Sequence, residues 1–450
     1  MSPHALLEET LGLEPTDLAK FAVSRNAFLP EENLPKMLSD SYYEPWELVA
    51  HNLPELIEAG RIRDAIRQLP MLSTDRLQSE AEWRRAYVIL SFFANAYIWG
   101  GDIPEQVRLV FPNRRGLRLI LLDANPPHQQ ILPPTLTVPF LRVSAHLELP
   151  PTLTYAGANL WNFHCEGDDF ADVEKLSTLL SFTGTESESW FLLISVAMEA
   201  KAASIIPTMT RAIEAIKTHD YQVIIEALEE LKTHIEEVGI LLERMHERCD
   251  PMTFYHQIRP FLAGTMNMEA AGLPKGVFYD EGDGRGEWRK LRGGSNGQSS
   301  LIMFWDIVLG IEHKGHSESK RSFHEEMRDY MPGPHARFLV HVARLGSIRQ
   351  LALDLEDSEG EAEQRLRKAY TAATETLTKF RQKHLGIVTR YILIPSKQPW
   401  TGSTRKNLAS SSSEKKGEHL TGTGGSQLFP FLKQTKDETR FAGMLVDSKP

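Results

Sequence analysis

The stretch SEGEAEQRLRKAYTAATETLTKFRQKHLGIVTRYILIP, residues 358–395, gives the strongest indication of the fold. Ser358 and Glu361 have the spacing of a capping box, and no proline follows until Pro395. A helix of more than about thirty residues extends for about 50 Å, because each residue adds 1.5 Å. The pattern therefore predicts a helix that crosses a whole domain.

Three other segments also have helical patterns. Residues 86–99 form an apolar run of about fourteen residues, which is shorter than the roughly twenty that a bilayer span needs and favours a buried helix. Thr185 and Glu188 have capping-box spacing and predict a helix that ends at Pro207. In residues 221–249 the apolar positions recur at alternating steps of four and three, which indicates a bundle helix.

These patterns predict an all-α protein. Prolines divide the first third into short helices, so we expect a small N-terminal helical domain over residues 1–170, packed on a larger helical domain over residues 171–396. Residues 397–420 are rich in Ser and Lys and predict a flexible loop. Apolar residues return in 421–435, which should dock on the large domain, and 436–450 reads as a polar tail.

Composition excludes several classes of protein. The 450 residues are 41% hydrophobic and 24% charged, which is typical of a globular protein. The net charge is −10 and no long basic block occurs, so nucleic acid is not an expected partner. Cys165 and Cys249 are too few for a disulfide framework. Because the N-terminus lacks the pattern of a signal peptide, we expect a cytoplasmic protein without a membrane segment.

Several motifs resemble ligand-binding sites but lack the residues that such sites need. The glycine-rich segments 293–300 (GGSNGQSS) and 422–426 (GTGGS) fit neither nucleotide-binding loop pattern. Residues 280–287 (DEGDGRGE) lack the ligand positions of a calcium loop and favour a solvated turn. His313 and His316 have metal-like spacing, but no carboxylate is positioned to complete a site, so a surface loop is expected.

His384 differs from these because its helical neighbours predict that it faces the interior. It could be a hydrogen-bonded core histidine or a ligand. Arg381 lies one turn earlier, and Gly386 leaves room for a flat cofactor. Haem needs an imidazole for its iron, apolar walls and cations for its propionates. The neighbours on its helix face are Phe380, Ile387, Val388 and Tyr391.

With these residues in view, the sequence resembles the indoleamine 2,3-dioxygenase family, and its fungal members in particular. The motifs occur in family order over roughly residues 40–435. The resemblance implies an all-helical enzyme with haem b, ferrous when active, that inserts O₂ across the indole 2,3 bond of L-tryptophan to give N-formylkynurenine. This is the first step of the kynurenine pathway, which serves tryptophan catabolism and NAD biosynthesis. The motifs are RRAYVILSFFANAYIWG (84–100), LELPPTLTYAGANLWN (147–162), FYHQIRPFLAG (254–264), GGSNGQSS and FWDIVLGIEH (293–313), YMPGPHARFL (330–339), HLGIVTRYILIP (384–395) and GTGGS (422–426).

The resemblance also implies a role for individual residues. His384 matches the proximal haem ligand, with Arg381, Asp306 and Ser295 as haem support. A segment at 421–435 would close over the substrate. The positions that match the substrate pocket are Tyr155, Phe191, Ser195, Phe254, Arg259 and Thr423, and the positions where this sequence departs from better-known members are Ala158, Asn159, Tyr255 and Asn296.

The partners implied are L-tryptophan or a related indoleamine, O₂ and a reductant, with the chain expected to be a monomer. Two other functions were weighed against tryptophan turnover. One is a haem protein that binds O₂ with little or no catalysis, or a dioxygenase of another indoleamine. The other is a helical scaffold without a cofactor. Residues matching a substrate-carboxylate partner argue against an oxygen carrier, which has no use for one.

Overall fold

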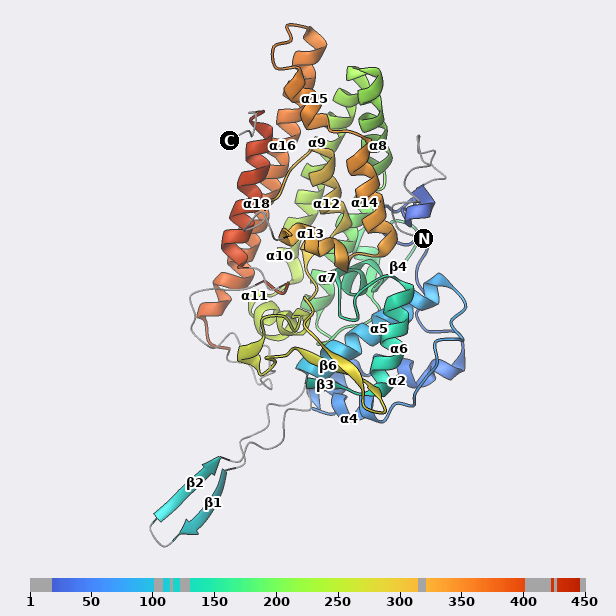
Figure 1. Ribbon diagram of the computed structural model, residues 1–450, viewed down its shortest axis with the longest axis vertical. Coiled ribbons are helices and arrows are strands. Elements are labelled where there is room, and N and C mark those ends of the chain that lie inside the picture. Colours follow the sequence, from blue (N-terminus) through green and yellow to red (C-terminus); the bar gives the residue numbers. More distant parts are fainter. Residues whose placement is uncertain are drawn as a thin grey trace.

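The structure is a computed structural model that describes residues 18–100, 108–113, 116–121, 130–314, 321–400, 422–424 and 427–445. Helices dominate it and the strands are short, which confirms the all-α prediction (Figure 1). The helices of the first half are α2 (Glu44–His51), α3 (Leu53–Glu58), α4 (Ile62–Arg67), α5 (Glu80–Trp99), α6 (Pro134–His146), α7 (Glu186–Lys201) and α8 (Ile205–Glu214). Those of the second half are α9 (Tyr221–Glu243), α10 (Met245–Arg248), α11 (Pro251–Thr253), α12 (Ser300–Val308), α13 (Phe323–Met327), α14 (Gly333–Leu345), α15 (Ile348–Asp354), α16 (Glu361–Val388) and α18 (Leu428–Gly443).

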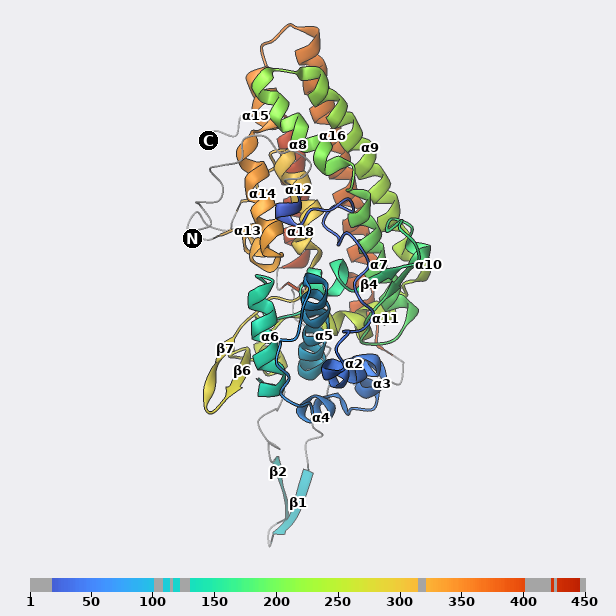
Figure 2. The same cartoon turned by 90° about the vertical axis from the view of Figure 1, so that its right-hand side faces the viewer.

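The long helices gather in one part of the molecule and the early helices in the other. Helices α8, α9, α14, α16 and α18 run along its long axis, while α2 to α6 form a smaller unit at one end (Figures 1 and 2). Helix α16 packs between α9 and α18. A small helical unit against a larger helical bundle is the predicted architecture, and the boundary at residue 170 stays a prediction.

Helix α5 is the buried helix expected from its apolar run. Every residue from Arg85 to Trp99 is buried, and the Ser79 hydroxyl caps its start by accepting from the backbone N–H of Glu82 at 3.2 Å. Among the described residues no single helix is long and apolar enough to cross a membrane, although the bent pair Glu186–Lys201 and Ile205–Thr218 meets that criterion jointly.

Helix α16 begins two residues later than a capping box at Ser358 would place it, so that detail of the prediction is wrong. Its N-cap is Gly360, and the Glu363 carboxylate folds back so closely that a Cβ on Gly360 would lie 2.0 Å from Glu363 Oε2. A larger residue at position 360 would require the flexible Glu363 carboxylate to move aside. At the other end α16 continues into the π-helical turn η12 (Thr389–Leu393), which keeps His384 inside a continuous helix.

Helix α7 ends before Pro207, contrary to the prediction. The Thr185 hydroxyl caps its start as expected, accepting from the Glu188 N–H at 3.3 Å. The chain breaks after Lys201 and bends by 42° into α8, where Pro207 lies in the first turn. Proline is tolerated there because first-turn N–H groups need no helical partner.

Short strands were missed in the sequence. Strand β1 (Arg108–Asn113) pairs antiparallel with β2 (Gly116–Leu121), and β4 (Phe163–Cys165) pairs antiparallel with β5 (Leu176–Thr178). Strand β6 (Val277–Gly282) pairs parallel with β3 (Ile131–Leu132) and antiparallel with β7 (Arg285–Arg289). The expected turn in DEGDGRGE is the tip of the β6–β7 hairpin. Strands this short leave almost no periodicity to detect.

The chain does not become a polar tail at residue 436. Helix α18 continues to Gly443, and its residues Thr439 and Ala442 are buried against α16 because polar and small side chains pack closely there. Most of the loop predicted at 397–420 lies outside the described residues. Residues 421, 425–426 and 446–450 lie entirely outside them. The remaining short helical turns are η1 (Ala19–Phe21), η2 (Ser41–Tyr43), η4 (Ala156–Leu160), η5 (Val173–Lys175), η6 (Ala215–Thr218), η7 (Phe254–Ile258), η8 (Arg259–Leu262), η9 (Glu269–Ala271), η10 (Asn296–Gln298), η11 (Arg328–Tyr330) and η13 (Pro395–Lys397).

Candidate active site

Two adjoining cavities lie among α7, α9, α16, α18 and the glycine loop (residues 293–297), and His384 borders both. Their volumes are about 170 Å³ and about 110 Å³. They share a wall formed by Tyr155, Leu242, Asn296, Gly297, His384, Phe431 and Leu432. We call the larger one the aromatic cavity and the smaller one the charged cavity, after the side chains described below.

His384 is deep in the protein, yet its side chain is accessible from the cavities. Burial, and then the Arg381 charge, lower the pKa of His384 to about 4, so the imidazole is neutral at physiological pH. No hydrogen bond joins its ring to another residue that the structure describes. A neutral imidazole with an available lone pair is the state that binds a metal. Together with apolar walls and two arginines on the cavities, this donor fits haem iron.

The aromatic cavity has a wall of packed rings. The centroids of Phe191 on α7 and Phe254 on η7 are 4.8 Å apart at 56°, and those of Phe254 and Tyr391 are 5.8 Å apart at 87°. Such tilted and edge-on pairs fix one another's orientation. The Tyr391 hydroxyl donates to the backbone carbonyls of Met245 and Cys249, which anchors this wall to the body of the protein.

Three π-helical turns supply residues of this cavity. Turn η4 carries Ala158 and Asn159, η7 begins with Phe254, and η12 carries Tyr391. A π-turn is rare, because it widens the helix, and it occurs often at functional sites. The Asn159 amide donates to the Leu192 carbonyl at 3.0 Å, which ties η4 to α7.

Arg259 places a cation on the aromatic cavity. Its guanidinium lies 5.5 Å from the centre of the Tyr255 ring. Burial lowers the pKa of Arg259 below its usual value, but a guanidinium remains charged at neutral pH. A buried cation beside aromatic rings suits a small anion that carries an apolar group. Tyr255 itself is buried behind Arg259 and does not line either cavity.

The glycine loop brings backbone close to backbone. A Cβ on Gly264 would lie 2.2 Å from Gly293 N, so neither chain segment could approach the other with a larger residue there. The Thr423 hydroxyl donates to the Gly294 carbonyl at 2.6 Å, which seats residues 422–424 on this loop. Ser295 caps η10, and its Oγ accepts from the Gly297 N–H at 3.2 Å.

Glu199 is a buried carboxyl that the sequence reasoning missed. It lies on α7 one turn after Ser195 and lines the charged cavity. Burial raises the pKa of Glu199 to about 7, although the Ser299 hydroxyl donates to Oε1 at 2.6 Å. Burial and then the Glu199 charge likewise raise the pKa of Tyr155 well above its usual value. Its position four residues after Ser195 was the available signal.

The prediction that His313 lies in a surface loop is wrong. Its side chain is 7% exposed, and its two ring nitrogens contact two carboxylates: Nε2 lies 2.9 Å from Asp306 Oδ2 and Nδ1 lies 2.7 Å from Glu438 Oε2. Glu438 comes from α18, far along the sequence, so no local spacing could indicate it. Arg381 pairs with the other oxygen of Asp306. His316 lies outside the described residues.

The two cavities bring together every predicted site residue except Tyr255. The aromatic cavity is lined by Tyr155, Ala158, Asn159, Phe191, Phe254, Arg259, Ser295, Asn296, His384 and Thr423. The charged cavity is lined by Tyr155, Ser195, Asn296, Asp306, Arg381 and His384. The roles expected for these residues remain predictions at this point.

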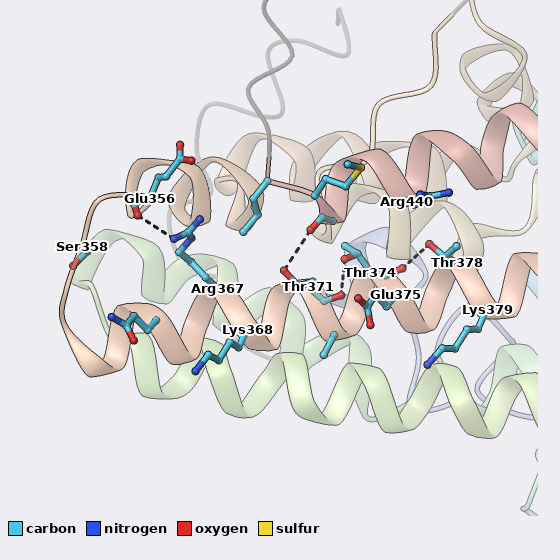
Figure 3. Close-up of a pocket in the computed structure, with 15 residues that line it drawn as sticks. Glu356, Ser358, Arg367, Lys368, Thr371, Thr374, Glu375, Thr378, Lys379 and Arg440 are labelled. Carbon is cyan, nitrogen blue, oxygen red and sulfur yellow. Dashed lines mark hydrogen bonds between the residues drawn. The ribbon is translucent and has the colours of Figure 1, made fainter.

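A larger cleft, of about 970 Å³, lies away from His384 between α16 and the end of α18 (Figure 3). It is an open surface groove whose walls are threonines and charged side chains, already joined by bonds such as Thr371 Oγ1 to the Gly443 carbonyl at 3.3 Å. An open polar groove of this kind does not enclose an apolar ligand. The two cavities beside His384 are therefore the candidate site.

Comparison with known proteins identifies the family of the chain. The family model described as indoleamine 2,3-dioxygenase matches residues 17–442. The chain belongs to the indoleamine 2,3-dioxygenase family. Enzymes of this family are haem-dependent dioxygenases that act on indoles. Haem is therefore the cofactor for which the residues around the His384 cavities are assessed.

Relatives in this family cover nearly the whole chain. An indoleamine 2,3-dioxygenase of Aspergillus nanangensis, nanC, is 38% identical over 433 residues, which is 94% of this chain and 96% of the relative. The 6-hydroxytryptophan 2,3-dioxygenase of Fusarium equiseti, fscD, is 37% identical over 427 residues, 94% of this chain and 97% of that one. An indoleamine 2,3-dioxygenase of Saccharomyces cerevisiae is 35% identical over 451 residues, with 94% and 92% covered.

Proposed function

We propose that this enzyme inserts both atoms of O₂ across the indole 2,3 bond of L-tryptophan to give N-formylkynurenine. The observation that carries the proposal is the aromatic cavity, in which packed phenylalanine rings and a buried arginine stand beside a neutral histidine. A substrate with a flat apolar ring and an α-carboxylate matches both features.

The substrate's two ends would meet different groups. Phe191 and Phe254 offer ring faces and edges to the indole, whose position they fix by packing. Arg259 offers a planar fork to the carboxylate, and an ion pair sheltered from water is stronger than one at the surface. Holding both ends sets the indole in one orientation, which is the main contribution that a protein makes to such a reaction.

Haem would be held by His384, with Arg381, Asp306 and Ser295 around it. When bound, haem iron supplies the binding and activation of dioxygen. The His384 imidazole is neutral and free of competing hydrogen bonds to described residues, so it can donate its lone pair. Arg381 and Asp306 form a buried ion pair on the charged cavity, and the guanidinium would supply positive charge for a haem propionate.

Residues 422–424 would close the pocket. Thr423 sits on the glycine loop and lines the aromatic cavity, so its segment is placed to cover a bound substrate. Exclusion of water strengthens the pairing of Arg259 with a carboxylate and protects the reacting groups. Ser195, one turn after Phe191 on α7, borders the charged cavity and would at most adjust hydrogen bonding.

Turnover of L-tryptophan by the purified, haem-loaded and chemically reduced enzyme tests the proposal. N-formylkynurenine is measured for the wild type, for His384→Ala and for His219→Ala, a histidine on an exposed turn. Product from the wild type and from His219→Ala, with none from His384→Ala, is expected. A wild type that holds haem and forms no product at millimolar tryptophan would remove tryptophan as the substrate.

A hydroxylated tryptophan is a second candidate substrate. One relative is named a 6-hydroxytryptophan 2,3-dioxygenase, and Asn159 gives the aromatic cavity of this chain a polar group. Comparison of kcat/KM for L-tryptophan and 6-hydroxy-L-tryptophan decides between them. A preference for the hydroxylated substrate of more than about tenfold, which Asn159→Val abolishes, would favour this second candidate.

A further inference from the structure

A chain of four buried charged groups links three helices beside the charged cavity. Arg381 on α16 pairs with Asp306 on α12, Asp306 Oδ2 lies 2.9 Å from His313 Nε2, and His313 Nδ1 lies 2.7 Å from Glu438 Oε2 on α18. The side chains are 9%, 5%, 7% and 16% exposed in that order, so water competes little with these contacts. We call these four residues the charge chain.

The contacts indicate which groups carry protons. The pKa values of Asp306 and Glu438 are both lowered, so both are carboxylates that accept hydrogen bonds; both nitrogens of His313 then donate, which makes the ring an imidazolium. Two cations, Arg381 and His313, then balance two carboxylates, Asp306 and Glu438. Buried charges are tolerated when each is paired in this way, and removal of one partner leaves the others uncompensated.

A metal ion is the other occupant that these residue types suggest. His324 lies beside His313, with ring centroids 3.6 Å apart and planes at 14°, and Asp306 is within reach of both. A metal bound by two imidazoles lies in the plane of each ring. Two nearly parallel rings stacked at this spacing have no such common point, so the arrangement suits stacking of an imidazolium on a neutral ring.

The charge chain holds helix α18 against the cavities. Glu438 also accepts from the Lys314 N–H at 3.1 Å, and Arg381 donates to the Thr435 carbonyl at 2.7 Å. One end of the same helix carries Leu428, Phe431 and Leu432, which line the cavities around His384. Release of Glu438 would therefore loosen a wall of the haem site.

We propose that His313 is a positioning residue, which as an imidazolium between Asp306 and Glu438 fixes α18 against the cavities and thereby keeps haem bound. The proposal rests on haem as the cofactor of the family and is independent of which indole is the substrate. Its tests below therefore use haem retention and folding stability, which can fail or succeed whatever the outcome of the tryptophan assay.

The charges facing His313 support this protonation state. Burial alone would lower the pKa of His313, but the Asp306 charge and the hydrogen bonds to Asp306 and Glu438 outweigh it and raise the pKa. Burial alone would raise the pKa of Asp306, but the charges of Arg381 and His313 outweigh burial and lower this pKa to about 2. The groups around the ring are Asp306 on α12, Lys314 next to it in sequence, His324 on α13, Arg381 on α16 and Glu438 on α18, while Arg328 on η11 acts on the neighbouring His324.

The sign of the pH effect follows. A raised pKa means that the contribution of His313 is complete below its ordinary pKa of about 6.5 and is lost as pH rises through the raised value. The lowered pKa of Glu438, where hydrogen bonds outweigh burial, means that its contribution is lost only in acid. Haem retention and thermal stability of the wild type should therefore decline as pH rises through the raised pKa of His313.

A double-mutant cycle tests the charge balance. The variants are His313→Gln, Glu438→Gln and the double variant, with Asp437→Asn as a control for an exposed carboxylate one residue away on α18. The measurements are the rate of haem loss to an excess of apomyoglobin and the melting temperature of the haem-free protein, each across pH. His313→Gln strands one negative charge, so haem loss should accelerate by at least about tenfold.

Glu438→Gln should have a smaller effect, because His313 can then release a proton and become neutral, which leaves no charge unpaired. The double variant should recover most of the loss in His313→Gln and should lack the decline with rising pH, while Asp437→Asn behaves as the wild type. Haem loss in His313→Gln within about twofold of the wild type would overturn the proposal, as would a double variant no better than His313→Gln. Stabilisation of the wild type by zinc that His313→Gln abolishes would also overturn it and assign a metal site.

Discussion

The two cavities that meet at His384 are built from opposite chemistry. The aromatic cavity is shaped by rings such as Phe191 and Phe254, which pack without any fixed proton or charge. The charged cavity is bordered by Asp306 and Arg381, an ion pair whose two charges depend on one another, and by the buried carboxyl of Glu199. Aromatic neighbours position a substrate ring by packing alone, whereas a buried charge needs a partner of opposite charge at one place.

This difference predicts how the two cavities respond to mutation. In the aromatic cavity each residue should act nearly on its own, because packing contributions at separate positions add. In the charged cavity a change at one residue should be felt by the whole charge chain, because buried charges share partners. The predictions below test this contrast, beginning with Arg259, the one residue that places a charge among the aromatic rings in the described lining.

Arg259→Ala should raise KM for L-tryptophan by about a hundredfold, because loss of a sheltered partner for a carboxylate costs a few kcal/mol. Steady-state kinetics on the haem-loaded enzyme measures the change. Arg259→Lys keeps the positive charge without the planar fork, so its KM should lie between those of the wild type and Arg259→Ala. Arg390→Ala, an exposed arginine on η12, is the matched control. A KM for Arg259→Ala within about threefold of the wild type would contradict the carboxylate role.

Glu199→Gln should remove a pH dependence of folding stability. Burial raises the pKa of Glu199 to about 7, so the folded protein keeps a proton that the unfolded chain releases near pH 4.5. The contribution of Glu199 to the free energy of unfolding is therefore complete below about pH 4.5. It falls as pH rises to about 7 and then levels off, with a total loss of about 3 kcal/mol.

Denaturant unfolding from pH 4 to 8 measures this slope in the haem-free protein. The glutamine variant should show a flatter profile across the window, and Glu236→Gln, an exposed glutamate on α9, should keep the wild-type profile. Equal slopes in the wild type and Glu199→Gln would show that this carboxyl does not hold its proton.

Local pattern was enough to predict much of the fold. The apolar spacing of residues 221–249 and the run at 86–99 became α9 and α5, because a helix buries residues that recur near every third or fourth position. His384 was placed inward by the same logic. Its motif-bearing neighbours in the aromatic cavity could be named from the resemblance, since they lie within contiguous stretches of sequence.

The charge chain could not be predicted. His313 and Glu438 are 125 positions apart, and their contact exists only because α18 packs on α16. A histidine among Lys, Gly and Ser reads as solvent-exposed unless its distant partner is known. The short strands were missed for a related reason, since β3 has only two residues and its partner β6 lies far along the chain.

Arg292→Ala should give the smallest effect, a rise in KM of about two- to fivefold with little change in kcat. Arg292 donates to the Gly424 carbonyl at 2.5 Å and to Glu326 at 2.8 Å through Nε, so it fastens residues 422–424 beside the glycine loop. Such a partly exposed contact contributes about 1 kcal/mol. Faster hydrogen exchange in peptides containing Thr423 should accompany the change. Arg321→Ala, which breaks an exposed ion pair with Asp329, is the control. Unchanged hydrogen exchange at Thr423 in Arg292→Ala would show that residues 422–424 are held by the contact of Thr423 with Gly294 instead.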